Sequence, residues 1–146
     1  MKRIEMPYNP WPRATFWRAI AGVWLLPVTL IAAVGVLAFA AVGWVHASAV
    51  AGVIDLEISG PFAAWMSRRR WAAFTLGPVV WFWNAAAARD PSTARHEREH
   101  VRQYLALGPL MLLAYPAAGV IAVLRGGHFY YDNHFERAAR RAAGGV

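Results

Sequence analysis

The residues best suited to chemistry are His96, Glu97 and His100, which stand in the order His-Glu-Arg-Glu-His. On a helix, this spacing places the two imidazoles one turn apart on the same face, with a carboxylate directly after the first. A zinc hydrolase needs two neutral nitrogen ligands for the metal and a base beside the water that the metal activates. The pentad therefore predicts zinc ligands at His96 and His100 and a general base at Glu97.

The pentad lies in a segment with clear signals for a helix. Asp90 is suited to the N-cap and Pro91 to the first helical position, while Gly108-Pro109 ends or kinks the helix. A helical wheel places the histidines on an inward stripe. Four charged residues are expected on the opposite side, facing water or lipid headgroups: Arg95, Arg98, Glu99 and Arg102. Two alternatives stay open, namely a pair of buried, hydrogen-bonded histidines without metal, and a structural zinc site.

A catalytic zinc ion needs a third protein ligand. Four candidates follow residue 124: His128, Asp132, His134 and Glu136. We favour Glu136, which is expected in the first turn of a final helix, and then His134 before His128. The alternative is that Asn133 caps this helix and Glu136 completes a capping box without any metal.

The uncharged segment Leu105–Leu124 restricts where the site can form. If it crossed a bilayer once, the pentad and every candidate third ligand would lie on opposite sides. A metal site therefore requires the chain to return, and Gly108-Pro109 and Tyr115-Pro116 are bend signals. We expect a hairpin of two short helices, roughly 110–114 and 117–124; the alternative is a simple second span.

The composition indicates a membrane protein. Of the 146 residues, 58% are hydrophobic and 16% charged, and Ala19–Val45 runs for 27 residues without a charge. This length is enough for an uncleaved transmembrane anchor, and Trp17, Trp24 and Trp44 lie near its ends. The alternative is a signal peptide cleaved near Ala47-Ser48-Ala49. We expect an N-terminal basic segment and anchor over residues 1–48 and one domain over 49–146.

The remaining segments predict an α+β domain. Gly52–Ile58 alternates as a strand with Asp55 and Glu57 on its wet face, and 62–70 fits a short amphipathic helix. Trp71–Leu76 and Val79–Trp83 fit two further strands. The stretch 71–88 also lacks charge, so a second membrane span there is the alternative.

The net charge of +7 has a membrane explanation. Four basic residues precede the apolar run, Lys2, Arg3, Arg13 and Arg18, as on a cytoplasmic face. No platform of interleaved aromatic and basic residues supports nucleic-acid binding, so membrane lipids are the expected partners. We expect a bacterial membrane location with a cytoplasmic N-terminus. The domain over residues 49–146 is then expected outside the cytoplasm, or inside it if 71–88 is a second span. The sequence does not indicate an oligomeric state.

With His-Glu-x-x-His and a later Glu-x-x-Ala, the chain resembles the gluzincin metallopeptidases, especially membrane-associated members such as the CAAX-processing and heat-shock membrane proteases. It also resembles small bacterial membrane proteins of unassigned function that carry the His-Glu-x-x-His-x-x-Gln-x-x-x-x-Gly-Pro run seen over His96–Pro109. The resemblance covers roughly 52–140 and is specific at the pentad. It implies zinc on His96, His100 and Glu136, Glu97 as base, and a small zincin-like domain.

These features together predict a membrane-bound zinc metallopeptidase that hydrolyses peptide bonds through a zinc-activated water. Tyr130, Tyr131 or His128 would stabilise the oxyanion, and a strand near 71–83 would hold an extended substrate. The families it resembles are larger, with more membrane spans. The alternative is a non-catalytic membrane protein with a structural or vestigial metal site that binds lipid or a partner. A substrate-sized cleft beside the pentad would favour the enzyme. An iron-dependent histidine-box oxidase would need more than the five histidines present.

Overall fold

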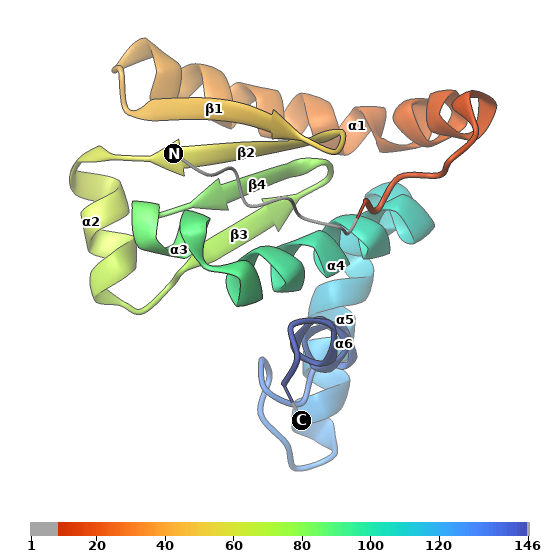
Figure 1. The fold of residues 1–146 in the computed structure, drawn as a ribbon. Helices are drawn as coiled ribbons and strands as arrows, with labels where there is room; N and C mark the ends of the chain where they lie inside the picture. Colours follow the sequence, from red (N-terminus) through yellow and green to blue (C-terminus); the bar gives the residue numbers. More distant parts are fainter. Residues whose placement is uncertain (1–8, 146) are drawn as a thin grey trace.

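A computed structural model describes residues 9–145, so the predicted basic residues Lys2 and Arg3 lie outside the described part of the chain. Figure 1 shows the arrangement of its helices and strands. In chain order these are α1 (Thr15–Ala41), β1 (Val45–Val50), β2 (Val53–Ile58), α2 (Gly60–Arg68), β3 (Ala73–Leu76), β4 (Val79–Phe82), α3 (Ala85–Arg89), α4 (Pro91–Leu107), the 3-10 turn η1 (Gly108–Leu110), α5 (Met111–Leu124) and α6 (His134–Ala142).

The four strands form one mixed sheet in the order β1-β2-β4-β3. β1 pairs antiparallel with β2, β2 pairs parallel with β4, and β4 pairs antiparallel with β3. β1 and β3 are therefore the edge strands of the described sheet. The predicted strands at 52–58, 71–76 and 79–83 are confirmed as β2, β3 and β4. β1 was missed, and the domain boundary expected at residue 48 falls inside it.

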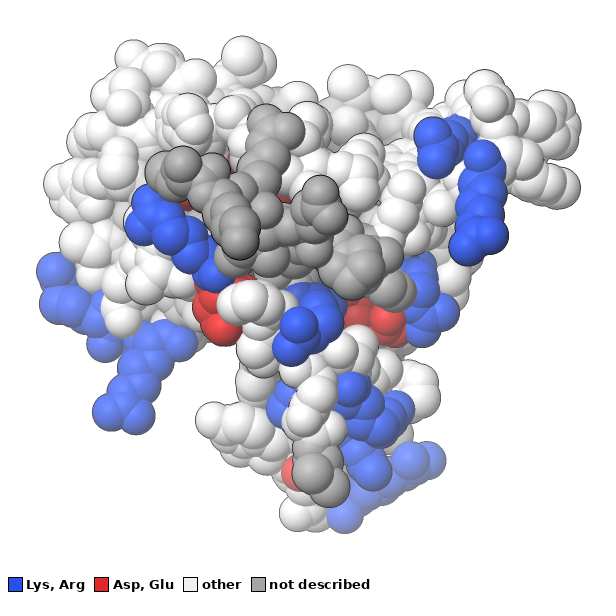
Figure 2. Space-filling model, viewed as in Figure 1, with Lys and Arg blue, Asp and Glu red and all other residues white. Residues whose placement is uncertain are grey.

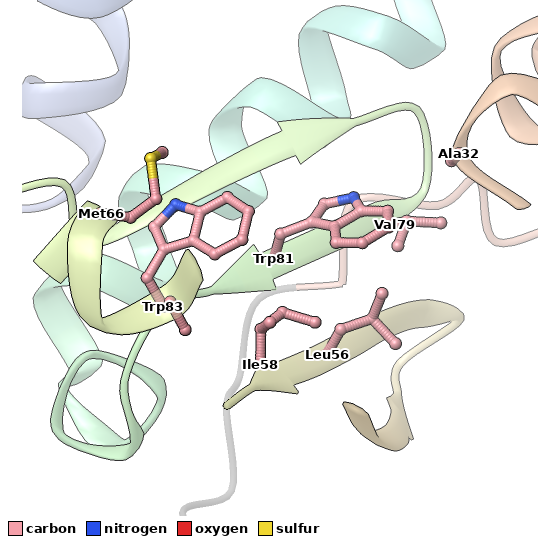
Figure 3. Packing of buried hydrophobic residues seen from close by; sticks show 8 residues of the cluster. Ala32, Leu56, Ile58, Met66, Val79, Trp81 and Trp83 are labelled. Atoms are coloured by element: carbon pink, nitrogen blue, oxygen red, sulfur yellow. The ribbon is translucent and has the colours of Figure 1, made fainter. Parts of the chain in front are cut away.

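Helices cover both faces of the sheet, because alternate strand residues point to opposite sides. On one face, Trp81 of β4 and Trp83, directly after this strand, pack with Leu56 and Ile58 of β2 (Figure 3). The helices α1 and α2 cover this face through Ala32 and Met66. On the other face, a second cluster joins the strands to α3 and α4: Val53, Val80, Phe82, Ala87 and Val101. The sheet therefore gives α4 a rigid support.

The predicted pentad helix is confirmed as α4. The Asp90 carboxylate accepts hydrogen bonds from the backbone N–H groups of Ser92 and Thr93, and Pro91 is the first helical residue. The prediction is wrong for two of the four charged residues expected to face solvent. Glu99 is only 4% exposed, and Arg98 is only 1% exposed and forms two hydrogen bonds, of 2.7 and 2.6 Å, with Asp55 of β2. Asp55 accordingly points towards α4 instead of lying on a wet face.

The return of the chain after α4 also differs from the prediction. The segment expected to form two short helices is one helix, α5, which continues through Pro116. The chain comes back through residues 125–133, and α6 lies against α5 (Figure 1), with contacts to α4 as well. The residues after 124 are therefore on the same side as the pentad, as a metal site requires.

The α+β class and the apolar N-terminal helix are confirmed. Two helical segments are long and apolar enough to cross a membrane, Thr15–Ala41 and Pro91–Leu124. The second is not a single straight helix, because Gly108 adopts φ +56° and ψ −136° between α4 and α5. This backbone conformation is open to glycine and strained for other residues.

Candidate metal centre

Two helices bring three ligand groups to one point. His96 and His100 lie one turn apart on α4, and Glu136 lies in the first turn of α6. The Nε2 atoms of the two histidines are 3.2 Å apart. The Glu136 carboxylate reaches His96 with Oε2 and His100 with Oε1, at 3.3 Å in each case. One ligand atom from each residue lies within 4.8 Å of the others, so the group could hold a metal ion.

Gln103 determines which nitrogen of His100 faces this group. Its amide nitrogen donates to the carbonyl oxygen of Phe135 at 3.1 Å, so its amide oxygen is directed at His100 Nδ1, 2.9 Å away. An amide oxygen can only accept, so Nδ1 of His100 carries a proton. In the neutral ring, the lone pair is then on Nε2, which points at His96 and Glu136. Such outer hydrogen bonds are the usual way a metal-binding histidine is oriented.

Glu136 is placed by the start of α6. The Asn133 side chain caps this helix by accepting from the backbone N–H of Phe135, and donates to the Tyr115 carbonyl on α5. The Glu136 carboxylate, 3% exposed, accepts a 2.6 Å hydrogen bond from the Tyr115 hydroxyl. Asn133 therefore caps α6, as the capping-box alternative expects. The Glu136 carboxylate, however, faces the two histidines, as the ligand role requires.

The electrostatics of the group favour a bound cation. Burial alone would raise the pKa of Glu136, but hydrogen bonds from His100 and His96 hold it well below its usual value. Burial would likewise lower the pKa of His100, but the hydrogen bond to Glu136 and the charge of Glu97 raise it. The Glu136 Oε2 atom is buried and accepts no well-formed hydrogen bond in the described structure, because its contact with His96 Nε2, at 3.3 Å, does not have the geometry of one. A metal ion on this oxygen would satisfy it.

Glu97 is held on the sheet side of α4. The Thr75 hydroxyl on β3 donates a 2.6 Å hydrogen bond to its Oε2 atom, and both side chains are 6% exposed. This contact joins the carboxylate after the first histidine to an edge strand. Neither Thr75 nor Tyr115 was identified from the sequence. In the sequence, each of them is a single hydroxyl-bearing residue in an otherwise apolar segment, and this pattern does not indicate which carboxylate it binds.

The other predicted ligands lie outside the group. His134 is exposed at the start of α6, and His128 is exposed in the returning loop, where its Nδ1 accepts from the backbone N–H groups of Tyr130 and Tyr131. Asp132 accepts from the His128 backbone N–H. Tyr130 of this loop is 41% exposed, and partial burial together with the charge of the nearby Glu136 raises the pKa of its hydroxyl far above its usual value.

The centre is largely covered. The side chains of His96, His100 and Glu136 are 16%, 10% and 3% exposed. Two shallow cavities of about 380 and 390 Å³ lie elsewhere, one beside Arg70 and Asn84 and the other between α1 and Leu105. Neither is lined by a residue of the pentad or by Glu136.

Comparisons of the chain with protein-family models, with curated proteins and with solved structures give no match.

Proposed function

We propose that this protein is a membrane-associated, zinc-dependent peptidase of the gluzincin type. The single observation that carries the proposal is the triangle formed by the His96, His100 and Glu136 side chains. Its two Nε2 atoms are 3.2 Å apart, each lies 3.3 Å from a different oxygen of the Glu136 carboxylate, and one ligand atom from each residue lies within 4.8 Å of the others. A tetrahedral zinc ion with bonds of about 2.0–2.1 Å separates its ligand atoms by about 3.3 Å. Two histidines and one glutamate are also a ligand set of catalytic zinc sites.

The residues around the triangle fit hydrolysis of a peptide bond. When bound, zinc would lower the pKa of a water molecule towards about 7 and polarise the scissile carbonyl. Glu97 would take the proton as the water oxygen bonds to the carbonyl carbon, and would deliver it to the nitrogen as the C–N bond breaks. Tyr130 would donate a hydrogen bond to the developing oxyanion.

The edge strand β3 fits an extended substrate. β3 pairs only with β4 among the described strands, so its other edge has no strand partner there, and a peptide strand would pair with this edge. Thr75 of this strand donates a hydrogen bond to the Glu97 carboxylate, so the strand lies next to the proposed base. A peptide added to β3 would therefore run beside the residue that handles the proton.

The experiment is zinc content per chain by elemental analysis, for the detergent-purified parent and three variants. We expect about one zinc in the parent and in His134→Ala, and none in His100→Ala or Glu136→Ala. His134→Ala is the matched control, since it removes an exposed histidine outside the triangle. A parent without zinc after reconstitution, or zinc lost only with His134→Ala, would contradict the proposed site.

A second measurement separates the enzyme from a non-catalytic metal protein. That alternative is favoured by the cover over the centre, where the His96, His100 and Glu136 side chains are 16%, 10% and 3% exposed. Glu97→Gln should keep its zinc but lose turnover of a quenched fluorescent peptide library. Equal turnover in the parent and in Glu97→Gln would remove the proposed mechanism. Zinc without turnover in either protein would identify the non-catalytic alternative.

A further inference from the structure

The helix α1 is in lateral contact with the rest of the protein over most of its length. Its buried residues form one stripe, Ala21, Leu25, Val28 and Ala32. The stripe continues through Gly35, where an added Cβ would lie 2.8 Å from the Trp81 ring, to Phe39, whose ring lies 5.8 Å from that of Trp81. From Ala21 to Phe39 is about 27 Å along a helix, close to the roughly 30 Å thickness of the hydrocarbon core. If α1 crossed a bilayer, the sheet and α4 would lie at bilayer depth beside it.

The sheet is unsuited to that depth. β1 follows α1 directly and runs back along it (Figure 1), and it pairs only with β2 in the described structure. Its side chains from His46 to Ala49 are all exposed, and they include His46 and Ser48. Open sheet edges that face lipid do not occur within the hydrocarbon region, because their backbone groups have no partner there. This arrangement argues against a crossing by α1 in the folded protein.

The outward side of α1 nevertheless requires an apolar environment. Ten large hydrophobic residues of this helix are more than 40% exposed: Phe16, Trp17, Ile20, Val23, Trp24, Leu26, Leu30, Ile31, Val34 and Leu37. Figure 2 shows no charged side chain along α1 except near its N-terminal end. A surface of this extent on a folded protein marks a membrane or protein contact.

Basic residues lie near both ends of this apolar surface. Arg13 and Arg18 are exposed at the N-terminal end. At the other end, Phe39 contacts Phe62 of α2, and α2 ends in the exposed triplet 68–70. Trp65 of α2 is 43% exposed, with the Arg69 guanidinium 4.2 Å from the centre of its ring. None of these five arginines forms an ion pair within the described residues. Apolar surface edged by tryptophan and arginine is characteristic of helices that lie in the plane of an anionic membrane surface.

We infer that α1 lies within one leaflet of an anionic bilayer, parallel to the membrane plane, and does not cross it. Both arginine groups then contact headgroups of the same leaflet, and the outward side of α1 enters the acyl region. The helix α5 agrees with this orientation, because its 14 residues span only about 21 Å and cannot cross alone. The inference concerns the attachment surface and is independent of zinc and of peptidase activity.

The chain contains no cysteine, so single cysteines can be labelled in the full-length protein. Thr15→Cys and Ala41→Cys are small changes at exposed positions, at the start and at the end of α1. Each variant is treated with a membrane-impermeant maleimide in sealed right-side-out and inverted bacterial membrane vesicles. We expect both cysteines to react in the same vesicle preparation and to be protected in the other. Reaction in opposite preparations would overturn the inference.

A depth measurement tests the same inference without sealed vesicles. Spin labels are attached at Phe16, Val23, Ile31 and Val34, each changed to cysteine in turn, in vesicles that contain phosphatidylglycerol. All four positions are exposed and lie on one side of α1. An in-plane helix places the four labels at similar depth. A crossing helix would place Ile31 more than about 10 Å deeper than Phe16, which would contradict the proposed orientation.

Discussion

Replacement of Gln103 tests whether the candidate centre is organised as a metal site. Gln103 is 8% exposed and makes two hydrogen bonds, one with His100 Nδ1 and one to the carbonyl of Phe135, directly before Glu136. It therefore orients a ligand on α4 and joins that helix to the turn that carries the ligand on α6. Gln103→Met keeps a side chain of similar length and removes both hydrogen bonds.

The expected loss follows from the burial of His100. Without Gln103, its Nδ1–H would be a buried donor with no acceptor, which costs about 1–3 kcal/mol. Loss of an outer hydrogen bond typically lowers metal affinity by about 10–100-fold, which corresponds to about 1.4–2.7 kcal/mol. The two ranges agree, so we expect the zinc dissociation constant to rise about 10–100-fold in Gln103→Met.

The assay is a competition titration of zinc against a fluorescent chelator, in detergent, for the parent, Gln103→Met and Ala106→Met. Ala106 is exposed on the same helix, so its variant introduces the same side chain without touching the centre. Urea unfolding of the metal-free proteins separates a loss of affinity from a loss of fold. An affinity for Gln103→Met within twofold of the parent would refute the role assigned to this residue.

Three further predictions concern the scaffold, and each is measured as the free energy of unfolding in urea. Asp55→Ala should cost about 3 kcal/mol, because it leaves the guanidinium of the deeply buried Arg98 unpaired. Arg98→Met should cost less, because the Asp55 carboxylate that it leaves unpaired is partly exposed. An equal cost of the two substitutions would contradict this reasoning. Asp90→Ala should cost about 0.5–2 kcal/mol through loss of the α4 cap, and Asp90→Asn much less. The hydrogen bond from the Thr93 side chain lowers the pKa of Asp90. The ionised carboxylate therefore stabilises the fold above about pH 4, and this stabilisation is lost as the pH falls further. Asp90→Asn should abolish this pH dependence of the free energy of unfolding. Gly108→Ala should cost about 1–3 kcal/mol, because φ is positive there and the new Cβ would meet the Trp24 ring. An unchanged free energy of unfolding would contradict this strain.

The parts of the centre that could be predicted from the sequence depend on local geometry. The spacing of His96 and His100 fixes their relation on any helix, and the Asp90-Pro91 start depends only on neighbouring backbone groups. The choice of Glu136 needed one long-range assumption, that the chain returns after α4, which the fold confirms.

The errors arose where packing overrides a local rule. The wheel assigned Arg98 to solvent because it assumes that a helix has one covered side, whereas α4 lies between the sheet and α6. Pro116 was expected to break a helix, yet α5 continues through it. A proline removes one backbone hydrogen bond, whereas a break in an apolar segment would leave several backbone groups without partners. The hydroxyls of Thr75 and Tyr115 acquire their carboxylate partners only through the tertiary fold.

The charges of the centre could be balanced either by a proton or by a metal ion. Contacts with His100 and His96 lower the pKa of the buried Glu136, and the hydrogen bond to Glu136 and the charge of Glu97 raise the pKa of His100, so both shifts favour a proton on the histidine beside an ionised carboxylate. A divalent ion in the place of that proton would balance the two carboxylates of Glu97 and Glu136. Because Gln103 and Asn133 already fix the ligand-bearing turns, the exchange would not require α4 and α6 to move. The helices thus bring His96, His100 and Glu136 together in a group that could hold a cation.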